Sequence, residues 1–269
     1  MQLIIDAHSH ASLNWYEPVS ALLHQMDAHG VEKAVLVQVN GHFDNDYQNG
    51  WVRRAPDRFA SVVLIDVACR PVDNLLEKLV EEGAVGLRLH ATDRSPGEDP
   101  WAIWQAAAGL GLSVSVGGRT VDFLAAAFRE LLTLNPGLTL TIEHMAGRNL
   151  PDPEETAELR TQVFQLIAPF PNVYLKIHGL GELAQRAATL TDESSLVDPP
   201  LAVLESALLT LGSGRILWGS DYPSVSDREG YANALKWPMD AIASLAPEGA
   251  RSVFGETAKR LYFPDTPRL

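Results

Sequence analysis

The sequence contains one cysteine, Cys69, in 269 residues. A single cysteine can form neither an internal disulfide nor a cysteine-based metal cluster, and we expect this one to be buried and inert. Basic residues are also few: 21 lysines and arginines stand against 34 aspartates and glutamates, which gives a formal net charge of -13. Nucleic acids and acidic membrane surfaces attract clusters of basic side chains, so this balance argues against both as partners.

Long hydrophobic runs are missing too. No stretch approaches the roughly 20 apolar residues that a membrane-spanning helix requires, and the N-terminus lacks the basic segment of a signal peptide. We therefore expect a soluble, cytoplasmic protein. No linker, repeat or low-complexity segment interrupts residues 1–269, so the sequence predicts one domain that can bury a substantial core.

The sequence does contain a repeated alternation of strand-like and helix-like segments. Apolar, β-branched runs typical of buried strands occupy residues 2–10, 33–39, 59–66, 84–90, 112–118, 138–144, 173–179 and 215–221. Segments with helical periodicity occupy residues 18–30, 71–83, 100–111, 120–136, 152–169 and 198–212. This alternation predicts a (β/α)8 TIM barrel. A doubly wound sheet is disfavoured, because no G-x-G-x-x-G fingerprint follows the first run.

Polar side chains stand where several predicted strands end. They are His8, His10, His90, His144, His178 and Asp221. Such barrels have their active sites at the carboxyl ends of the strands, so we expect these side chains to meet at one rim. Alternate strand residues share a face, so Asp6 should project with the two histidines that follow it. By the same rule His144 shares the face of Ile142, and Glu143 should point toward the helix layer.

Three motifs resemble the amidohydrolase superfamily: "DAHSH" in the first run, "GSDYP" at the end of the eighth and "FGETAKRLY" near the C-terminus. The segments "AVGLRLH", "LTIEHMAGRN" and "NVYLKIHG" further resemble its amidohydrolase-related branch, which includes 2-pyrone-4,6-dicarboxylate lactonase and sugar lactonases. The resemblance covers nearly the whole chain and implies a TIM-barrel hydrolase. The residues that it assigns to the site are His8, His10, His144, Asp221 and, as a substrate-holding arginine, Arg88.

The metal-binding pattern departs from that of the wider superfamily. The bridging lysine or glutamate of binuclear members is missing, which argues against two metals. Gly117 and Gly118 stand where many mononuclear members and the related decarboxylases have a histidine. One zinc or manganese ion could still be held by His8, His10, His144 and Asp221. Alternatively, the same side chains hydrogen-bond a substrate carbonyl in a metal-independent enzyme, as the lactonase branch implies.

The candidate residues suggest distinct roles. Asp221 is the candidate general base that accepts a proton from water. His144 could be a metal ligand, an acid for the leaving oxygen or an oxyanion stabiliser. Candidates for substrate binding are Arg88, His90, Arg148, Lys176 and His178. Cations at the rim of an acidic chain suit an anionic substrate, but they could instead pair with Asp66 or Glu143. Loop residues that could form an apolar wall are Trp15, Tyr16, His42 and Tyr47.

Together these features predict a hydrolase that opens a lactone or cyclic ester of a small anionic or hydroxylated molecule. Water activated by Asp221 would attack the ring carbonyl, with or without one divalent metal ion. The alternative is a metal-dependent decarboxylase of a small unsaturated or aromatic acid on the same barrel. A non-catalytic ligand-binding barrel is less favoured, because Asp221 and both first-strand histidines are present. The expected partner is a small molecule, and the family suggests a homodimer.

Overall fold

The computed structural model describes residues 2–69, 72–147, 155–183 and 200–264, and its strands form one parallel sheet in sequence order. The strands are β1 (Ile5–Ser9), β2 (Lys33–Val37), β3 (Phe59–Val63), β4 (Ala84–His90), β5 (Ser113–Gly117), β6 (Thr139–Ile142), β7 (Val173–His178) and β8 (Ile216–Gly219). A parallel bridge between Ser9 and Tyr222 joins the two ends of the sheet. The predicted TIM barrel is confirmed.

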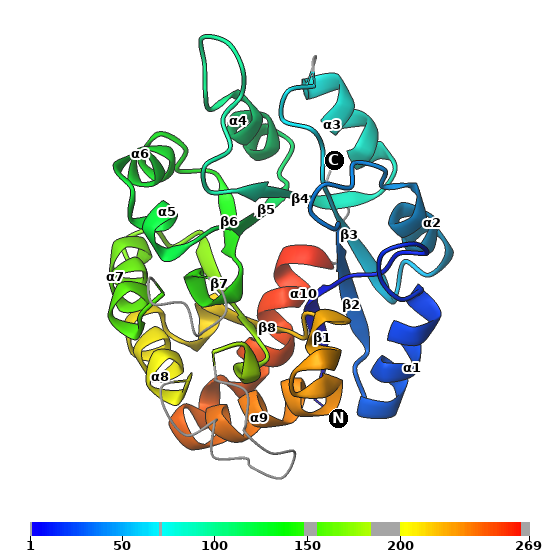
Figure 1. Ribbon diagram of the computed structural model, residues 1–269, viewed down its shortest axis with the longest axis vertical. Helices are drawn as coiled ribbons and strands as arrows, with labels where there is room; N and C mark the ends of the chain where they lie inside the picture. The colour runs from blue at the N-terminus through cyan, green and yellow to red at the C-terminus, as the bar shows by residue number, and fades with distance from the viewer. Residues whose placement is uncertain (1, 70–71, 148–154, 184–199, 265–269) are drawn as a thin grey trace.

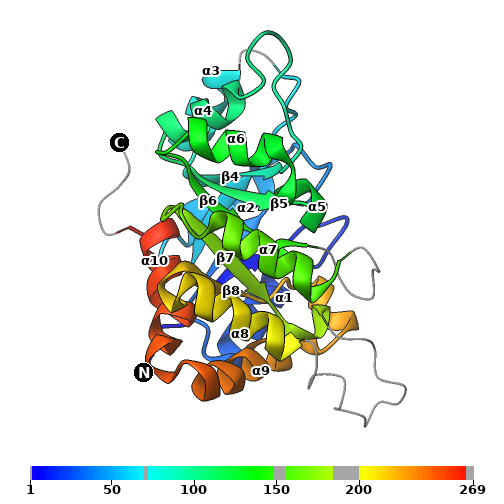
Figure 2. The same cartoon turned by 90° about the vertical axis from the view of Figure 1, so that its left-hand side faces the viewer.

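Most helices surround the sheet and connect successive strands (Figure 1 and Figure 2). They are α1 (Val19–His29), α2 (Asp46–Arg54), α3 (Val72–Glu81), α4 (Ala102–Gly109), α5 (Thr120–Leu124), α6 (Ala126–Leu134), α7 (Ala157–Ile167), α8 (Pro200–Leu211), α9 (Gly230–Leu245) and α10 (Thr257–Tyr262). Two single-turn helices near the barrel mouth are η1 (His144–Ala146) and η2 (Leu180–Glu182). Within the described ranges, no helix combines the length and apolarity needed to cross a membrane.

The predicted single helix over residues 120–136 is divided into α5 and α6. Ala125 between them is extended, with φ -61° and ψ 143°. The break lets Phe123 and Phe128 pack edge to face, with ring centroids 5.2 Å apart and both side chains buried. In a continuous helix these positions would lie about 140° apart around the axis and could not meet in this way.

The two faces of the sheet differ in what they bury. Leu140 and Ile142 of β6 point outward and join the large apolar core that includes Phe164 of α7. Thr141, between them, points inward, where its hydroxyl lies 3.0 Å from that of Tyr262 on α10. Figure 1 shows α10 in line with the centre of the barrel, and Figure 2 shows that it lies at one end of it. The inner apolar cluster comprises Ile5, Ala7, Val35, Val37, Ala60, Val62, Leu217, Ala258, Leu261 and Tyr262.

Candidate active site

A β-bulge directs two histidines of β1 into the barrel. The pairing of β1 with β2 shifts register between Asp6 and Ser9. Ala7 packs in the inner apolar cluster, yet His8 also faces the interior, where it meets the site residues of β6 and β8. Asp6 accepts a hydrogen bond from Tyr231 of α9 at 3.1 Å, on the helix side of the sheet. The prediction that Asp6 projects with the two histidines is wrong, because the bulge reverses the alternation.

Asp6 instead fixes the end of β8. Its carboxylate accepts hydrogen bonds from the Ser220 backbone N–H at 2.8 Å and from the Ser220 hydroxyl at 2.6 Å. Burial raises the pKa of Asp6 to about 6, and these hydrogen bonds oppose the rise. The next residue, Asp221, has φ 60°, a left-handed conformation uncommon for a residue other than glycine. Its N–H donates to His8 O at 2.8 Å, so the strained turn holds Asp221 against β1.

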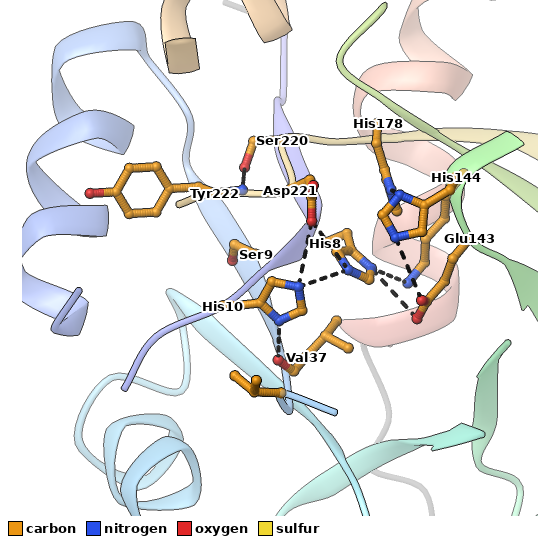
Figure 3. A network of polar contacts seen from close by, with 12 residues as sticks. His8, Ser9, His10, Val37, Glu143, His144, His178, Ser220, Asp221 and Tyr222 are labelled. Atoms are coloured by element: carbon orange, nitrogen blue, oxygen red, sulfur yellow. Dashed lines mark hydrogen bonds and ion pairs between the residues drawn. The ribbon is translucent and has the colours of Figure 1, made fainter. Parts of the chain in front are cut away.

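Asp221 and the β1 histidines form a compact cluster at the barrel mouth (Figure 3). The Nε2 atoms of His8 and His10 are 3.2 Å apart. Asp221 Oδ1 lies 3.5 Å from His10 Nε2 and 4.0 Å from His8 Nε2. His10 Nδ1 lies 2.6 Å from the Val37 carbonyl, to which it must donate, so Nε2 is the atom that faces the cluster. Two ring nitrogens and a carboxylate oxygen that lie this close together form a set of donor atoms that a cation could share.

The surroundings of Asp221 keep its carboxylate ionised. Burial raises the pKa of Asp221, but the hydrogen bond from His10 and the positive charges of His144, His10 and Arg228 outweigh it, so the pKa lies below its ordinary value. Arg228 Nη1 lies 3.5 Å from Asp221 Oδ2. An ionised carboxylate beside two imidazoles can accept a proton from water.

Several buried polar side chains lie beneath the cluster and surround Glu143. We call Arg88, Ser115, Glu143 and Lys176 the buried polar group. Glu143 accepts from Arg88 Nε at 3.1 Å and Nη2 at 2.7 Å, and from the Ser115 hydroxyl at 2.6 Å. Burial raises its pKa, but the charges of Arg88 and Lys176 hold it well below its ordinary value. The prediction that Glu143 points toward the helix layer is wrong. Large apolar residues of β6 face the helices, so the polar residues that alternate with them face inward.

Two predicted substrate-binding residues belong to this buried group. Arg88 donates to Glu143 and, through Nη1, to Gln38 O at 2.9 Å, and it is 6% exposed. Lys176 is fully buried, with Nζ 2.7 Å from the Ser115 hydroxyl and 3.2 Å from His8 Nδ1. Burial lowers the pKa of Lys176 to about 7, against the opposing charge of Glu143. These contacts favour the alternative in which the cations organise the rim.

His144 reaches the site through a sharp backbone turn. His144, Met145 and Ala146 all have positive φ, which turns the chain back over the end of β6. His144 Nδ1 donates to the carboxylate of Glu182, which follows β7 in η2. Burial lowers the pKa of His144, but the charge and hydrogen bond of Glu182 outweigh it, so the pKa lies above its ordinary value. The raised pKa favours the protonated form of His144, whose ring lies close to the carboxylate of Asp221.

His178 at the end of β7 packs beside the other histidines. Its ring centroid lies 3.9 Å from that of His144 and 4.2 Å from that of His8. Burial and the nearby positive charge of His144 lower its pKa well below the ordinary value. Its Nδ1 lies 2.7 Å from His144 Nδ1, whereas its buried Nε2 has no hydrogen-bond partner among the described residues. A neutral imidazole with an unused nitrogen suits contact with substrate or metal.

Other predicted residues lie away from this centre. His90 is partly exposed at the rim, 2.7 Å from the Thr92 hydroxyl and 3.9 Å from Asp122. Arg148 falls outside the described residues. Cys69 is exposed, so the prediction that it is buried is wrong; it lies in the surface loop after β3. No motif or predicted strand marks Glu182 or Arg228 in the sequence, because Glu182 lies in η2 beyond β7 and Arg228 lies in the segment between β8 and α9.

The residues fit a divalent cation. Tetrahedral zinc, bound at about 2.0–2.2 Å, separates its ligand atoms by about 3.3–3.6 Å, close to the spacing of His8 Nε2, His10 Nε2 and Asp221 Oδ1. A second group of ligand atoms, which does not include His10, comes from His8, His144, His178 and Asp221, and these atoms lie within 4.8 Å of one another. For His8 to bind through Nε2, its Nδ1 must hold the ring proton, and a neutral Lys176 amine would accept that hydrogen bond.

The fold has many structural relatives. An amidohydrolase from Burkholderia multivorans with bound zinc is 19% identical, with a TM-score of 0.77, and the match covers 97% of this chain and 99% of the other. A candidate 2-pyrone-4,6-dicarboxylic acid hydrolase from Pseudomonas putida is 19% identical, with a TM-score of 0.76 and 99% of both chains covered. The 5-carboxyvanillate decarboxylase of Sphingomonas paucimobilis is 13% identical, with a TM-score of 0.63, covering 98% of this chain and 99% of the other.

At these identities the structural relatives show the shared fold and not a shared substrate. A search of curated proteins found no match. The family comparison is more specific, because the amidohydrolase family model matches residues 5–263, nearly the whole chain. The predicted resemblance is confirmed: the chain belongs to the amidohydrolase family and is an amidohydrolase-type enzyme.

Proposed function

We propose that the protein hydrolyses a lactone or a related cyclic ester of a small molecule. The observation that supports this most directly is the pairing of Asp221 with His144 in one site. The surroundings lower the pKa of Asp221 and raise that of His144. Opposite shifts of two neighbouring groups widen the pH range in which the site holds an ionised base and a protonated acid together, and ester hydrolysis uses both.

The reaction begins when a water molecule attacks the ring carbonyl carbon. Asp221 takes one proton from this water as the new carbon–oxygen bond forms, and the carbonyl oxygen becomes an oxyanion. The tetrahedral intermediate then collapses, the ring carbon–oxygen bond breaks, and His144 donates its proton to the leaving alkoxide. The product is a hydroxy acid, and transfer of the Asp221 proton to neutral His144, directly or through water, restores both groups.

The oxyanion requires a hydrogen-bond donor or a cation. Arg88 is a poor candidate, because Glu143 and a backbone carbonyl already accept from its guanidinium. His178 is a better one: its neutral ring has a buried Nε2 without a partner among the described residues. One zinc or manganese ion held by His8, His10 and Asp221 would, when bound, polarise the carbonyl and acidify the water.

A second candidate function is decarboxylation of a small unsaturated or aromatic acid. The decarboxylase alternative requires a tightly bound metal ion. Its support is the spacing of His8 Nε2, His10 Nε2 and Asp221 Oδ1, which is close to that of metal ligands. The hydrolase is favoured because the acid–base pair of Asp221 and His144 has a role in each step of ester cleavage. A non-catalytic barrel would have no use for such a pair.

The test is a panel of lactones assayed with chelated and with zinc- or manganese-loaded protein. We expect hydrolysis of at least one lactone, and we expect Asp221→Asn to reduce kcat about 1,000-fold, within the range of general acid–base catalysis. The variant should still bind the substrate. Release of CO2 from an aromatic acid by metal-loaded protein, with all lactones inert, would establish the decarboxylase instead.

A further inference from the structure

Large apolar side chains are exposed at one part of the barrel mouth. Leu13 and Trp15 follow β1 and are 70% and 71% exposed, and Phe43 follows β2 and is 52% exposed. The other exposed large apolar residues of the described chain are Val121, Leu134, Leu209 and Leu245, on α5, α6, α8 and α9. Scattered exposed residues need no explanation, but several in two adjoining loops indicate a binding surface.

Ring contacts connect these loops to the candidate site. Trp15 lies edge-on to His42 with ring centroids 5.1 Å apart, which joins the loop after β1 to the loop after β2. Tyr16 stacks on His10 at 5.5 Å with an interplanar angle of 25°. We call Leu13, Trp15, Tyr16, His42 and Phe43 the aromatic rim. The rim runs from a histidine of the site outward to solvent.

Polar contacts, and not the apolar side chains of the rim, anchor both loops. In the first loop Ser12 N donates to Glu17 O at 3.0 Å, and the Glu17 carboxylate accepts from the hydroxyl of Tyr222. In the second, Asn45 Nδ2 donates to Phe43 O at 3.1 Å. Tyr47, which was predicted to join an apolar wall, accepts from the backbone of α1 and serves as an anchor. These polar contacts fix the backbone of each loop, whereas the side chains of Leu13, Trp15 and Phe43 remain mostly exposed to solvent.

We propose that the aromatic rim binds an aryl or similarly flat apolar substituent of the substrate, next to the reacting ring. This assignment rests on the proposed function for the reacting group and extends it to the class of substrate. Tyr16 covers His10, so a ring that opens at Asp221 would place its substituent along Tyr16 and against Trp15. Flat apolar groups gain from stacking and edge-on contacts with aromatic side chains.

The experiment compares δ-valerolactone with the same lactone bearing a phenyl group on the carbon next to the ring oxygen. Trp15→Ala should lower kcat/KM for the phenyl lactone about fivefold or more and leave kcat/KM for δ-valerolactone unchanged. Leu209→Ala is the matched control, because Leu209 is 81% exposed on α8, outside the mouth; it should change neither value. An equal effect of Trp15→Ala on both lactones, or no effect on either, overturns the proposal.

A binding measurement separates this proposal from the proposed function. The phenyl-substituted lactam replaces the ring ester by an amide. Isothermal titration calorimetry with this lactam measures the affinity of the aromatic rim for the phenyl group in the absence of turnover. Weaker binding by Trp15→Ala than by the natural protein supports the rim even if every lactone is inert. Equal binding of the phenyl lactam and the unsubstituted lactam by the natural protein overturns it. So does a change from dimer to monomer in Trp15→Ala with lactam binding unchanged, because the rim would then be an interface between copies.

Discussion

Replacement of Lys176 by methionine tests the account of the buried polar group. Lys176 is fully buried, and its amine meets the Ser115 hydroxyl and His8 Nδ1. Burial is the main cause of its low pKa, about 7 against an ordinary value of 10.5. Methionine has a similar length without the charge. Glu143 keeps Arg88 as its partner in the variant, so the fold should tolerate the change.

The magnitude follows from the two pKa values. The folded-state pKa lies below the unfolded value, so between pH 7 and 10.5 the unfolded chain binds more protons than the native protein. Above pH 10.5 the amine is neutral in both states, so its burial does not lower the free energy of unfolding. As the pH falls from 10.5 to 7, protonation of the unfolded chain lowers the free energy of unfolding. The shift of the Lys176 pKa from 10.5 to about 7 corresponds to a change of about 5 kcal/mol in the free energy of unfolding over this pH range. Between these limits the free energy of unfolding should rise with pH by at most about 1.4 kcal/mol per pH unit.

The assay is urea denaturation of metal-free protein at pH 7, 8 and 9. From pH 8 to 9 the natural protein should gain about 1 kcal/mol more than Lys176→Met. Lys236→Met is the control, because Lys236 is an exposed lysine on α9 whose loss should leave the pH dependence unchanged. If Lys176→Met and the natural protein show the same slope, the amine is not neutralised by burial, and our account of the group beneath the histidines is refuted.

Two further predictions concern the site itself. Glu182→Gln should reduce kcat about 100-fold for aliphatic lactones and much less for aryl esters, because good leaving groups need no proton from His144; steady-state kinetics checks this, and equal losses would contradict it. His10→Ala should weaken zinc binding by more than the roughly 10–100-fold that follows loss of an outer-sphere partner. Competition with a fluorescent chelator measures the affinity, and an unchanged value would indicate that His178 is the ligand instead.

The sequence was sufficient to predict the barrel, because each strand is an apolar run and most connections have helical periodicity. It also located the histidines, since the carboxyl ends of parallel strands meet at one rim. The errors concerned the direction of side chains. The prediction for Glu143 assumed that apolar residues of β6 face the barrel interior, whereas they pack against the helices. The prediction for Asp6 failed because a β-bulge has no clear sequence signature.

Residues that act through others were the hardest to identify. Glu182 lies in a turn after β7, four residues beyond His178, and its importance depends on where the η1 turn brings His144. Three consecutive positive φ angles produce that turn. None of the three residues is a glycine, so the sequence carries no signal that predicts it. Arg228 likewise meets Asp221 only after the chain has folded back beyond β8.

The charges of the site largely cancel before any substrate arrives. Glu143 offsets Arg88, while Asp221 and Glu182 surround Arg228 and His144. A carboxylate on the substrate would therefore find Arg88 already paired with Glu143. A neutral ester faces no such conflict, since it brings no charge until the oxyanion forms. The cancellation thus favours a reacting group that is neutral in the ground state, with negative charge developing next to His178 and the β1 histidines.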